Sequence, residues 1–159
     1  MYRNLLTLSF FGHSEIEITE KLKLDLRNLI KLKITQENFG VFLFGGLGKF
    51  DELAWEIVSD LKKEYPHIKR IFVLTDEKHL QKYKRPKYLN DEDYEEFIYL
   101  TPQYDGFKKR IYYRNVEMIN ISDYTIFYVK HTENSGAYKA FKYAKLKKKP
   151  CTNLTIIEK

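Results

Sequence analysis

The chain has 159 residues, of which 43% are hydrophobic and 16% aromatic. This composition suits one folded domain with a substantial core and excludes an intrinsically disordered chain. The formal net charge of +6 and the pI of about 9.2 favour an anionic partner, without choosing between nucleic acid, nucleotide and membrane surface.

The first half of the chain alternates short apolar runs with stretches that repeat apolar residues at helical spacing. Apolar runs bounded by glycine or charge are typical of buried strands, and apolar residues three and four positions apart indicate a helix face. In chain order, we expect a strand at 5–11, a helix at 17–32, a strand at 41–44, a helix over Leu53–Leu61 that stops near Pro66, and a strand at 70–75.

The second half continues the pattern after a less regular stretch at 76–110, which is polar and rich in tyrosine and lysine. The single cysteine, Cys151, has no disulfide partner in the chain, so it fits a reducing cytoplasm and we interpret it as a packed thiol. In chain order, we expect a short strand at 97–101, a helix at 109–122, a strand at 124–129, a helix at 135–148 and a last strand at 151–157.

Strands that alternate with helices along the whole chain define the expected fold. The pattern predicts a three-layer α/β sandwich, in which helices flank a mainly parallel sheet and the crossovers are right-handed. No linker or repeat divides residues 1–159, which we interpret as a single domain. The apolar run near the N-terminus is too short to span a membrane and lacks a cleavage site, so we expect no membrane partner. Ligands of such sheets bind beyond the carboxyl ends of the strands.

The first candidate site is the turn after the second strand, where Gly45, Gly46 and Gly48 precede a helix. Glycines let the backbone approach a ligand closely, and the N–H groups at a helix start favour an anion. The turn lacks the full dinucleotide-binding and P-loop patterns, so a phosphate site and a plain tight turn both stay open. Asp51 is either a helix cap or a ligand-facing hydroxyl acceptor or base.

Two further small polar loops follow predicted strands. Gly12, His13 and Ser14 come at the end of the first strand, where His13 is either polar surface or a contact to a phosphate or base. Ser14 is a candidate cap and phosphate donor. Ser135 and Gly136 lead into the late helix and repeat the anion-binding arrangement of the glycine turn.

Arginine and histidine positions give the remaining candidates. Arg110 and Arg114 lie four residues apart on one helix face, where they either clamp a phosphate or stay solvated. His67, His79 and His131 lack the spacing of a metal site, and no Ser-His-Asp order or Cys-His pair stands out. We therefore expect no metal and no bound cofactor.

Four motifs in order connect these loops to a known group of proteins. The segments SFFGHSEI, FLFGGLGKFDELAWEIV, YYRNVEMINISDYTIFYV and NSGAYKAFKYAKLKKKP resemble the SLOG superfamily, the Rossmann-like group of the DprA and LOG (lonely guy) proteins. Within that group, the resemblance is to the small YpsA-like branch. It covers nearly the whole chain, is weakest at 76–105, and depends on the order and spacing of motifs that are individually weak.

The resemblance implies a Rossmann-like fold that binds a nucleotide or nucleotide-derived ligand across the strand ends. The implied ligand-binding residues are Gly12, His13, Ser14, Gly45, Gly46, Gly48, Arg114, Asn115, Ser135 and Gly136. One departure concerns catalysis. Related deoxyribosyltransferases and nucleotide hydrolases place a nucleophilic Glu in the late turn, but here that position is Ala140. Asp51 and Glu15 are the remaining acid or base candidates, and Asp51 is the tentative catalytic residue.

Three functions follow in order of preference. The first is a nucleotide-binding or sensing module, because two small-residue turns and the arginine pair are present and the usual nucleophile is not. The second is a nucleoside-monophosphate N-glycosidase or phosphoribohydrolase of lonely-guy type that uses Asp51. A DNA-binding protein related to DprA ranks third, because basic residues are interleaved with 22 acidic ones and the lysines of 145–150 are typical of a solvated helix end. The sequence leaves open a homo-oligomer.

Overall fold

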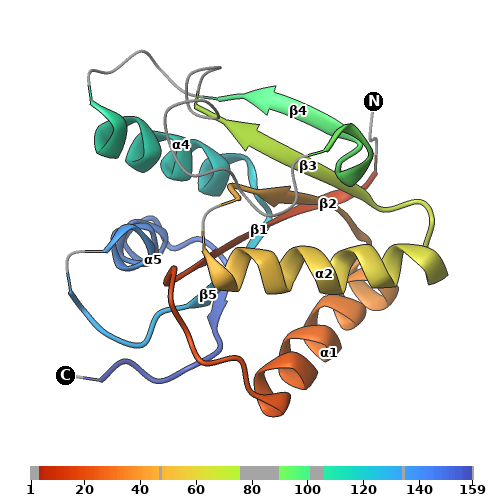
Figure 1. The fold of residues 1–159 in the computed structure, drawn as a ribbon, viewed down its shortest axis with the longest axis horizontal. Coiled ribbons are helices and arrows are strands. Elements are labelled where there is room, and N and C mark those ends of the chain that lie inside the picture. The colour runs from red at the N-terminus through yellow and green to blue at the C-terminus, as the bar shows by residue number, and fades with distance from the viewer. Residues whose placement is uncertain (1–3, 47, 76–89, 101–105, 134, 159) are drawn as a thin grey trace.

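The computed structural model describes residues 4–46, 48–75, 90–100, 106–133 and 135–158. Strands and helices alternate along these residues in the expected order (Figure 1). In chain order they are β1 (Leu6–Gly12), α1 (Glu20–Glu37), β2 (Phe39–Phe44), α2 (Lys49–Glu64), β3 (Lys69–Leu74), the 3-10 helix η1 (Asp91–Asp93), β4 (Glu96–Tyr99), α4 (Phe107–Ile121), β5 (Tyr124–Tyr128), α5 (Gly136–Leu146) and β6 (Cys151–Asn153).

The described strands form one sheet in the order β4-β3-β2-β1-β5-β6, and every neighbouring pair is parallel. The strands that follow β1 are added on one side as far as β4, whereas β5 and β6 lie on the other side of β1. The strand order therefore reverses between β1 and β5. In open parallel sheets such a reversal leaves a crevice outside the carboxyl ends of the strands, where ligands bind.

Helices cover both faces of the sheet, with α1 and α2 on one face and α4 and α5 on the other (Figure 1). Side chains of successive strand residues point to opposite faces, and both faces are covered, so β2 is buried and free of polar side chains along its whole length. Along β2, Phe42 and Phe44 enter the core beneath α1 and α2, while Leu43 enters the core beneath α4 and α5. The expected three-layer α/β sandwich is confirmed.

Helix α1 is longer than its apolar pattern predicts and continues past residue 32 to Glu37. The prediction stopped before Lys33, which looks polar in the sequence but is 7% exposed. Its ammonium lies 3.5 Å from the ring centroid of Tyr124, so a cation–π contact lets the stem of a charged side chain pack inside. The residue after the helix, Asn38, caps it in a left-handed conformation with φ of 62°.

The last strand is shorter than predicted, covering Cys151–Asn153 instead of 151–157. The Asn153 side chain ends the ladder, because its Oδ1 accepts from the Val129 N–H and its Nδ2 donates to the Val129 carbonyl, both at 2.9 Å. Among the described helices, none combines the length and apolarity that a membrane span requires.

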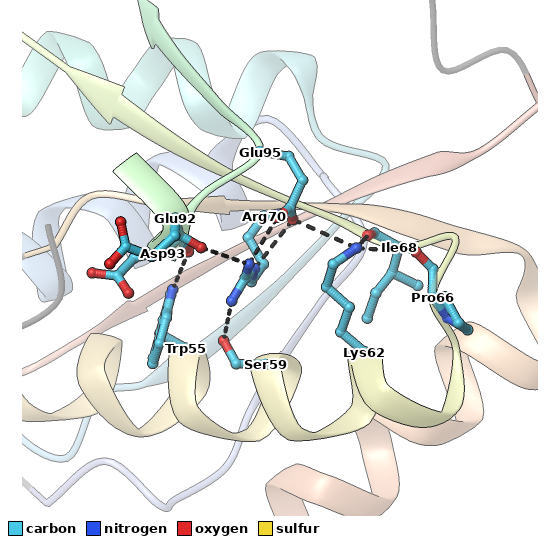
Figure 2. A network of polar contacts seen from close by, with 9 residues as sticks. All are labelled: Trp55, Ser59, Lys62, Pro66, Ile68, Arg70, Glu92, Asp93 and Glu95. Atoms are coloured by element: carbon cyan, nitrogen blue, oxygen red, sulfur yellow. Dashed lines mark hydrogen bonds and ion pairs between the residues drawn. The ribbon is translucent and has the colours of Figure 1, made fainter. Parts of the chain in front are cut away.

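One arginine fastens the segment before β4 to the rest of the sheet (Figure 2). The Arg70 guanidinium donates to both carboxylate oxygens of Glu95, at 3.1 and 2.7 Å, and to Ser59 Oγ at 3.0 Å. The indole N–H of Trp55 donates to the Asp93 carbonyl at 3.0 Å. These contacts join α2, β3 and the η1–β4 segment at the sheet edge away from β1 and β5, so they stabilise the fold at a distance from the crevice.

Candidate functional site

A cavity of about 590 Å³ opens beyond the carboxyl ends of β1 and β2, against α4 and the start of α5. We call it the strand-end cavity, and it lies at the reversal of the strand order. Three loops singled out in the sequence meet there. The predicted site residues in its lining are Gly12, His13, Ser14, Gly45, Asp51, Arg114, Asn115, Ser135 and Gly136, and Glu15 also lines it. Gly46 and Gly48 are not part of the lining.

The glycine turn after β2 is closed by the protein's own groups. The Gly46 N–H donates to Asp51 Oδ2 at 2.6 Å. The Lys49 N–H, at the start of α2, donates to the Ser14 carbonyl at 2.8 Å. The expectation that N–H groups of this turn are free for a phosphate is therefore wrong for these two. The Asp51 carboxylate takes the place at Gly46 that an external anion would need.

Arg114 lies beneath the cavity and is only 2% exposed. One of its terminal nitrogens donates to the carbonyls of Gly45 and Val73 at 3.2 and 3.3 Å, and the other donates to Asn115 Oδ1 at 3.2 Å. A Cβ added to Gly45 would lie 2.4 Å from the guanidinium, so the glycine makes room for it. The solvated alternative for Arg114 is wrong. Arg110 does not line the cavity, so the two arginines form no clamp there.

Asp51 is a buried carboxyl with an unusual pKa. Burial raises the pKa of Asp51 to about 7, although the Gly46 N–H and the positive charge of Arg114 act to lower it. Burial likewise lowers the pKa of Arg114 to about 10, against the opposing effect of Asp51. Asp51 does not cap an N–H group of its own helix, since it binds the turn that precedes the helix. Both of its protonation states are populated near neutral pH, which suits a general acid or base.

The raised pKa predicts how stability depends on pH. The pKa of the Asp51 carboxyl rises from 3.8 in the unfolded chain to about 7 in the fold, so the free energy of unfolding falls as pH increases through that window. The loss approaches roughly 4 kcal/mol at most above pH 7. We expect Asp51→Asn, which still accepts from Gly46, to lack this decline. Urea unfolding at several pH values between 4 and 8 measures it, and parallel curves for both proteins would contradict the burial cost.

His13 is a buried imidazole with one unused donor. It is 6% exposed, so the polar-surface interpretation is wrong. Its Nε2 accepts from the backbone N–H groups of Lys130 and His131 at 2.9 and 3.4 Å, and its ring stacks on the His131 ring with centroids 3.8 Å apart. Burial, and then His131, lower the pKa of His13. The neutral ring therefore carries its proton on Nδ1, which has no hydrogen-bond partner among the described residues.

The start of α5 forms another wall of the cavity. Ser135 caps this helix, because its Oγ accepts from the Tyr138 N–H at 3.2 Å. The next residue, Gly136, faces open space, and a Cβ added there would meet nothing within 4 Å. A helix N-terminus with room in front of it favours an anion. Lys108 from α4 also lines the cavity and adds a positive charge.

Six residues of the lining were not predicted as site residues: the apolar Phe10, Phe11, Ile111 and Ala137, and the polar Lys108 and His131. A signal existed for two of them, because Lys108, Ile111 and Asn115 are three and four residues apart and so share one face of α4. His131 follows β5 but was considered only as a metal ligand. Its place in the cavity depends on the stacking with His13.

Ala140 and Cys151 are both unsuited to act as a catalytic nucleophile. Ala140, at the position of the family nucleophile, is 1% exposed inside the core beneath α5 and is outside the cavity lining. Burial raises the pKa of the Cys151 thiol, which disfavours the nucleophilic thiolate. Within the described part of the chain, no cluster of three or more His, Cys, Asp or Glu residues could hold a metal ion.

No protein-family model and no curated protein matches the chain. Solved structures do match it. DNA processing protein A (DprA) from Streptococcus pneumoniae is similar with a TM-score of 0.64 and 13% identity, over 92% of this chain and 49% of that one. The two chains therefore share a fold, as the resemblance to the DprA and LOG proteins predicted. TM1055, a structural genomics target, is similar with a TM-score of 0.57 and 12% identity, over 92% of this chain and 72% of that one.

A third similar structure is DNA processing protein A from Helicobacter pylori, described for its single-stranded DNA binding mode. Its TM-score is 0.56 at 18% identity, over 99% of this chain and 70% of that one. The chain spans about half the length of the S. pneumoniae protein. At these identities the likeness shows a shared fold alone. The Rossmann-like fold that the resemblance implied is confirmed, and the assignment to the YpsA-like branch stays a prediction.

Proposed function

We propose that the strand-end cavity binds a nucleotide or nucleotide-derived ligand, and that the protein acts as a ligand-binding or sensing module. The observation that carries the proposal is the set of unlike polar groups gathered at the strand reversal. Lys108 and the start of α5 suit a phosphate, the Asp51 carboxyl suits sugar hydroxyls, and the unpartnered His13 Nδ1–H suits an acceptor atom. The volume of about 590 Å³ lies in the usual range of small-ligand sites.

The contacts of the glycine turn support one placement of the phosphate. The Gly46 N–H is occupied by Asp51, and an ionised Asp51 would repel a phosphate bound beside it. The start of α5 has an open approach at Gly136 and the positive charge of Lys108 in the same cavity. The phosphate therefore belongs at Ser135 and Gly136 in this proposal, which differs from the glycine turn emphasised by the sequence.

Filling the cavity at Gly136 tests the proposal. We expect AMP, ADP, cyclic AMP, NAD or ADP-ribose to bind in calorimetry more tightly than adenosine, which lacks phosphate. A ligand at 100 times its Kd adds about 2.7 kcal/mol to the free energy of unfolding, which a thermal shift detects. Gly136→Ala and Gly136→Val place one and three carbons in the open space, so affinity should fall a few-fold and then at least tenfold.

The control is the melting temperature without ligand, which both Gly136 variants should leave nearly unchanged because a Cβ there meets nothing. The proposal is overturned if no nucleotide of the panel binds, or if Gly136→Val binds as tightly as the natural protein.

The pKa of Asp51 favours the N-glycosidase as a second candidate function, since a carboxyl that titrates near 7 inside a cavity can act as an acid or base. Chromatography of the same binding mixtures separates the two functions. An intact nucleotide supports a binding module, whereas free base that disappears with Asp51→Asn supports turnover. DNA binding stays a prediction, and no observation on the cavity favours it.

A further inference from the structure

The positive charge of the chain is concentrated on one side of the fold. Residues 106–149, which contain α4, β5 and α5, carry eleven lysines and arginines against three acidic residues, a net +8, while the whole chain carries +6. Residues 136–149 include six lysines and no acid. Because α4 and α5 pack on the same face of the sheet, the exposed members of this basic set lie on the side of the fold that these helices cover, while Arg114 is buried.

An exposed apolar side chain lies among these lysines at the end of α5. Leu146 is 78% exposed, more than any other large hydrophobic side chain in the described helices. Lys145, Lys147 and Lys148 flank it in sequence, and all three are exposed. The helix dipole favours lysines at a helix C-terminus, but it does not account for an exposed leucine among them.

The end of α4 lies against the end of α5 and adds a second apolar side chain. The Tyr143 hydroxyl donates to Asn120 Oδ1 at 2.7 Å, and Lys149 Nζ donates to the Asn120 carbonyl at 3.4 Å. The next residue, Ile121, is 46% exposed. We call this surface the lysine-rich end, and it consists of Asn120, Ile121 and Lys145–Lys149.

We propose that the lysine-rich end docks the protein onto a membrane surface that carries anionic lipids. Clustered lysines are attracted to such a surface, and apolar side chains among them enter the boundary between headgroups and acyl chains. This differs from the expectation of no membrane partner, which concerned spanning and signal segments. Leu146 lies ten residues after Gly136, about 15 Å along α5, so the strand-end cavity stays open to water in the docked protein.

The chemistry of the surface favours lipid over two other partners. A second copy of the chain would bring lysines against lysines. A nucleic acid would neutralise the lysines and has Tyr138 and Tyr143 to stack on, because these line a pocket together with Lys145 and Leu146. It offers no apolar phase to Leu146 and Ile121, however. Anionic lipid supplies both the negative charge and an apolar phase.

Vesicle sedimentation tests the proposal with matched variants. The probe is a phosphatidylcholine vesicle with 30% phosphatidylserine, and pure phosphatidylcholine is the neutral reference. We expect binding to the anionic vesicle alone, weakened by salt. Leu146→Ser should weaken it about tenfold, and the triple change Lys145→Glu, Lys147→Glu, Lys148→Glu at least 30-fold.

The controls change the same chemistry on the opposite face. Leu24→Ser alters a leucine of α1 that is 58% exposed, and Lys21→Glu, Lys23→Glu, Lys63→Glu makes the same change in net charge on α1 and α2. Both controls should bind within about twofold of the natural protein, since short-range attraction acts only at the docked surface.

Three outcomes overturn the proposal. These are no binding to the anionic vesicle at low salt, equal weakening by the variants and their controls, and binding that Leu146→Ser leaves unchanged. Tighter binding of a fluorescein-labelled dT20 oligonucleotide that is insensitive to Leu146→Ser also overturns it, in favour of nucleic acid. None of these results bears on the nucleotide proposal, which Gly136→Val tests at the other end of α5.

Discussion

Replacing Arg114 with methionine is expected to lower the free energy of unfolding by about 3–5 kcal/mol. The guanidinium is 2% exposed and donates to the carbonyls at the ends of β2 and β3. Methionine keeps much of the volume but removes the hydrogen bonds to those carbonyls and the positive charge near Asp51. Because the Asp51 pKa then rises further, the loss should be larger at pH 8 than at pH 5. Urea unfolding at both pH values measures it.

Arg27→Met provides the matched control. Arg27 pairs with Asp60 at 2.7 Å on the surface, where its side chain is 40% exposed. Pairs of this kind contribute about 0–1 kcal/mol. If Arg114→Met lowered the free energy of unfolding no more than Arg27→Met, Arg114 would not hold the strand ends together.

Gly48→Ala is expected to be the second most damaging change, at about 3 kcal/mol or more. Gly48 has a φ of +97°, which L side chains rarely adopt, and an added Cβ would lie 2.4 Å from Ser14 Cα. The contact is with backbone, so no rotamer change relieves it. To relieve this clash the two loops would have to move apart. That movement would break the hydrogen bond from the Lys49 N–H to the Ser14 carbonyl, which joins the first two loops of the cavity.

Two other glycines separate the causes of that loss. Gly106 has a φ of +89° but open space around an added Cβ. Gly106→Ala should therefore lower the free energy of unfolding only through backbone strain, by about 1–2 kcal/mol. Gly136 has open space without a positive φ, so Gly136→Ala should be neutral within about 0.5 kcal/mol or slightly stabilising. Thermal unfolding should rank the losses as Gly48, Gly106, Gly136. Equal losses at Gly48 and Gly106 would show that the Ser14 loop moves aside freely.

The candidate site shows how far sequence reasoning reached. Gly12, Ser14, Gly45 and Ser135 were singled out because each follows a predicted strand, and all four line one cavity. That reasoning works because parallel strands end at the same edge of a sheet. Whether these residues bind a ligand stays a prediction. The partners of Asp51 could not be predicted, since the hydrogen bond to Gly46 depends on how the turn bends back onto α2.

The sequence by itself determined the alternation of strands and helices, and with it the three-layer parallel fold and the loops that meet at the strand ends. Hydrophobic periodicity is local, so it can be read along the chain. Only the tertiary structure decided which polar groups are already paired. In the fold the Gly46 N–H binds Asp51 and Arg114 is buried. His13 Nδ1 has no hydrogen-bond partner among the described residues, and the start of α5 has open space at Gly136. The tertiary structure also placed the end of α4, with the exposed Ile121, beside the lysines that end α5.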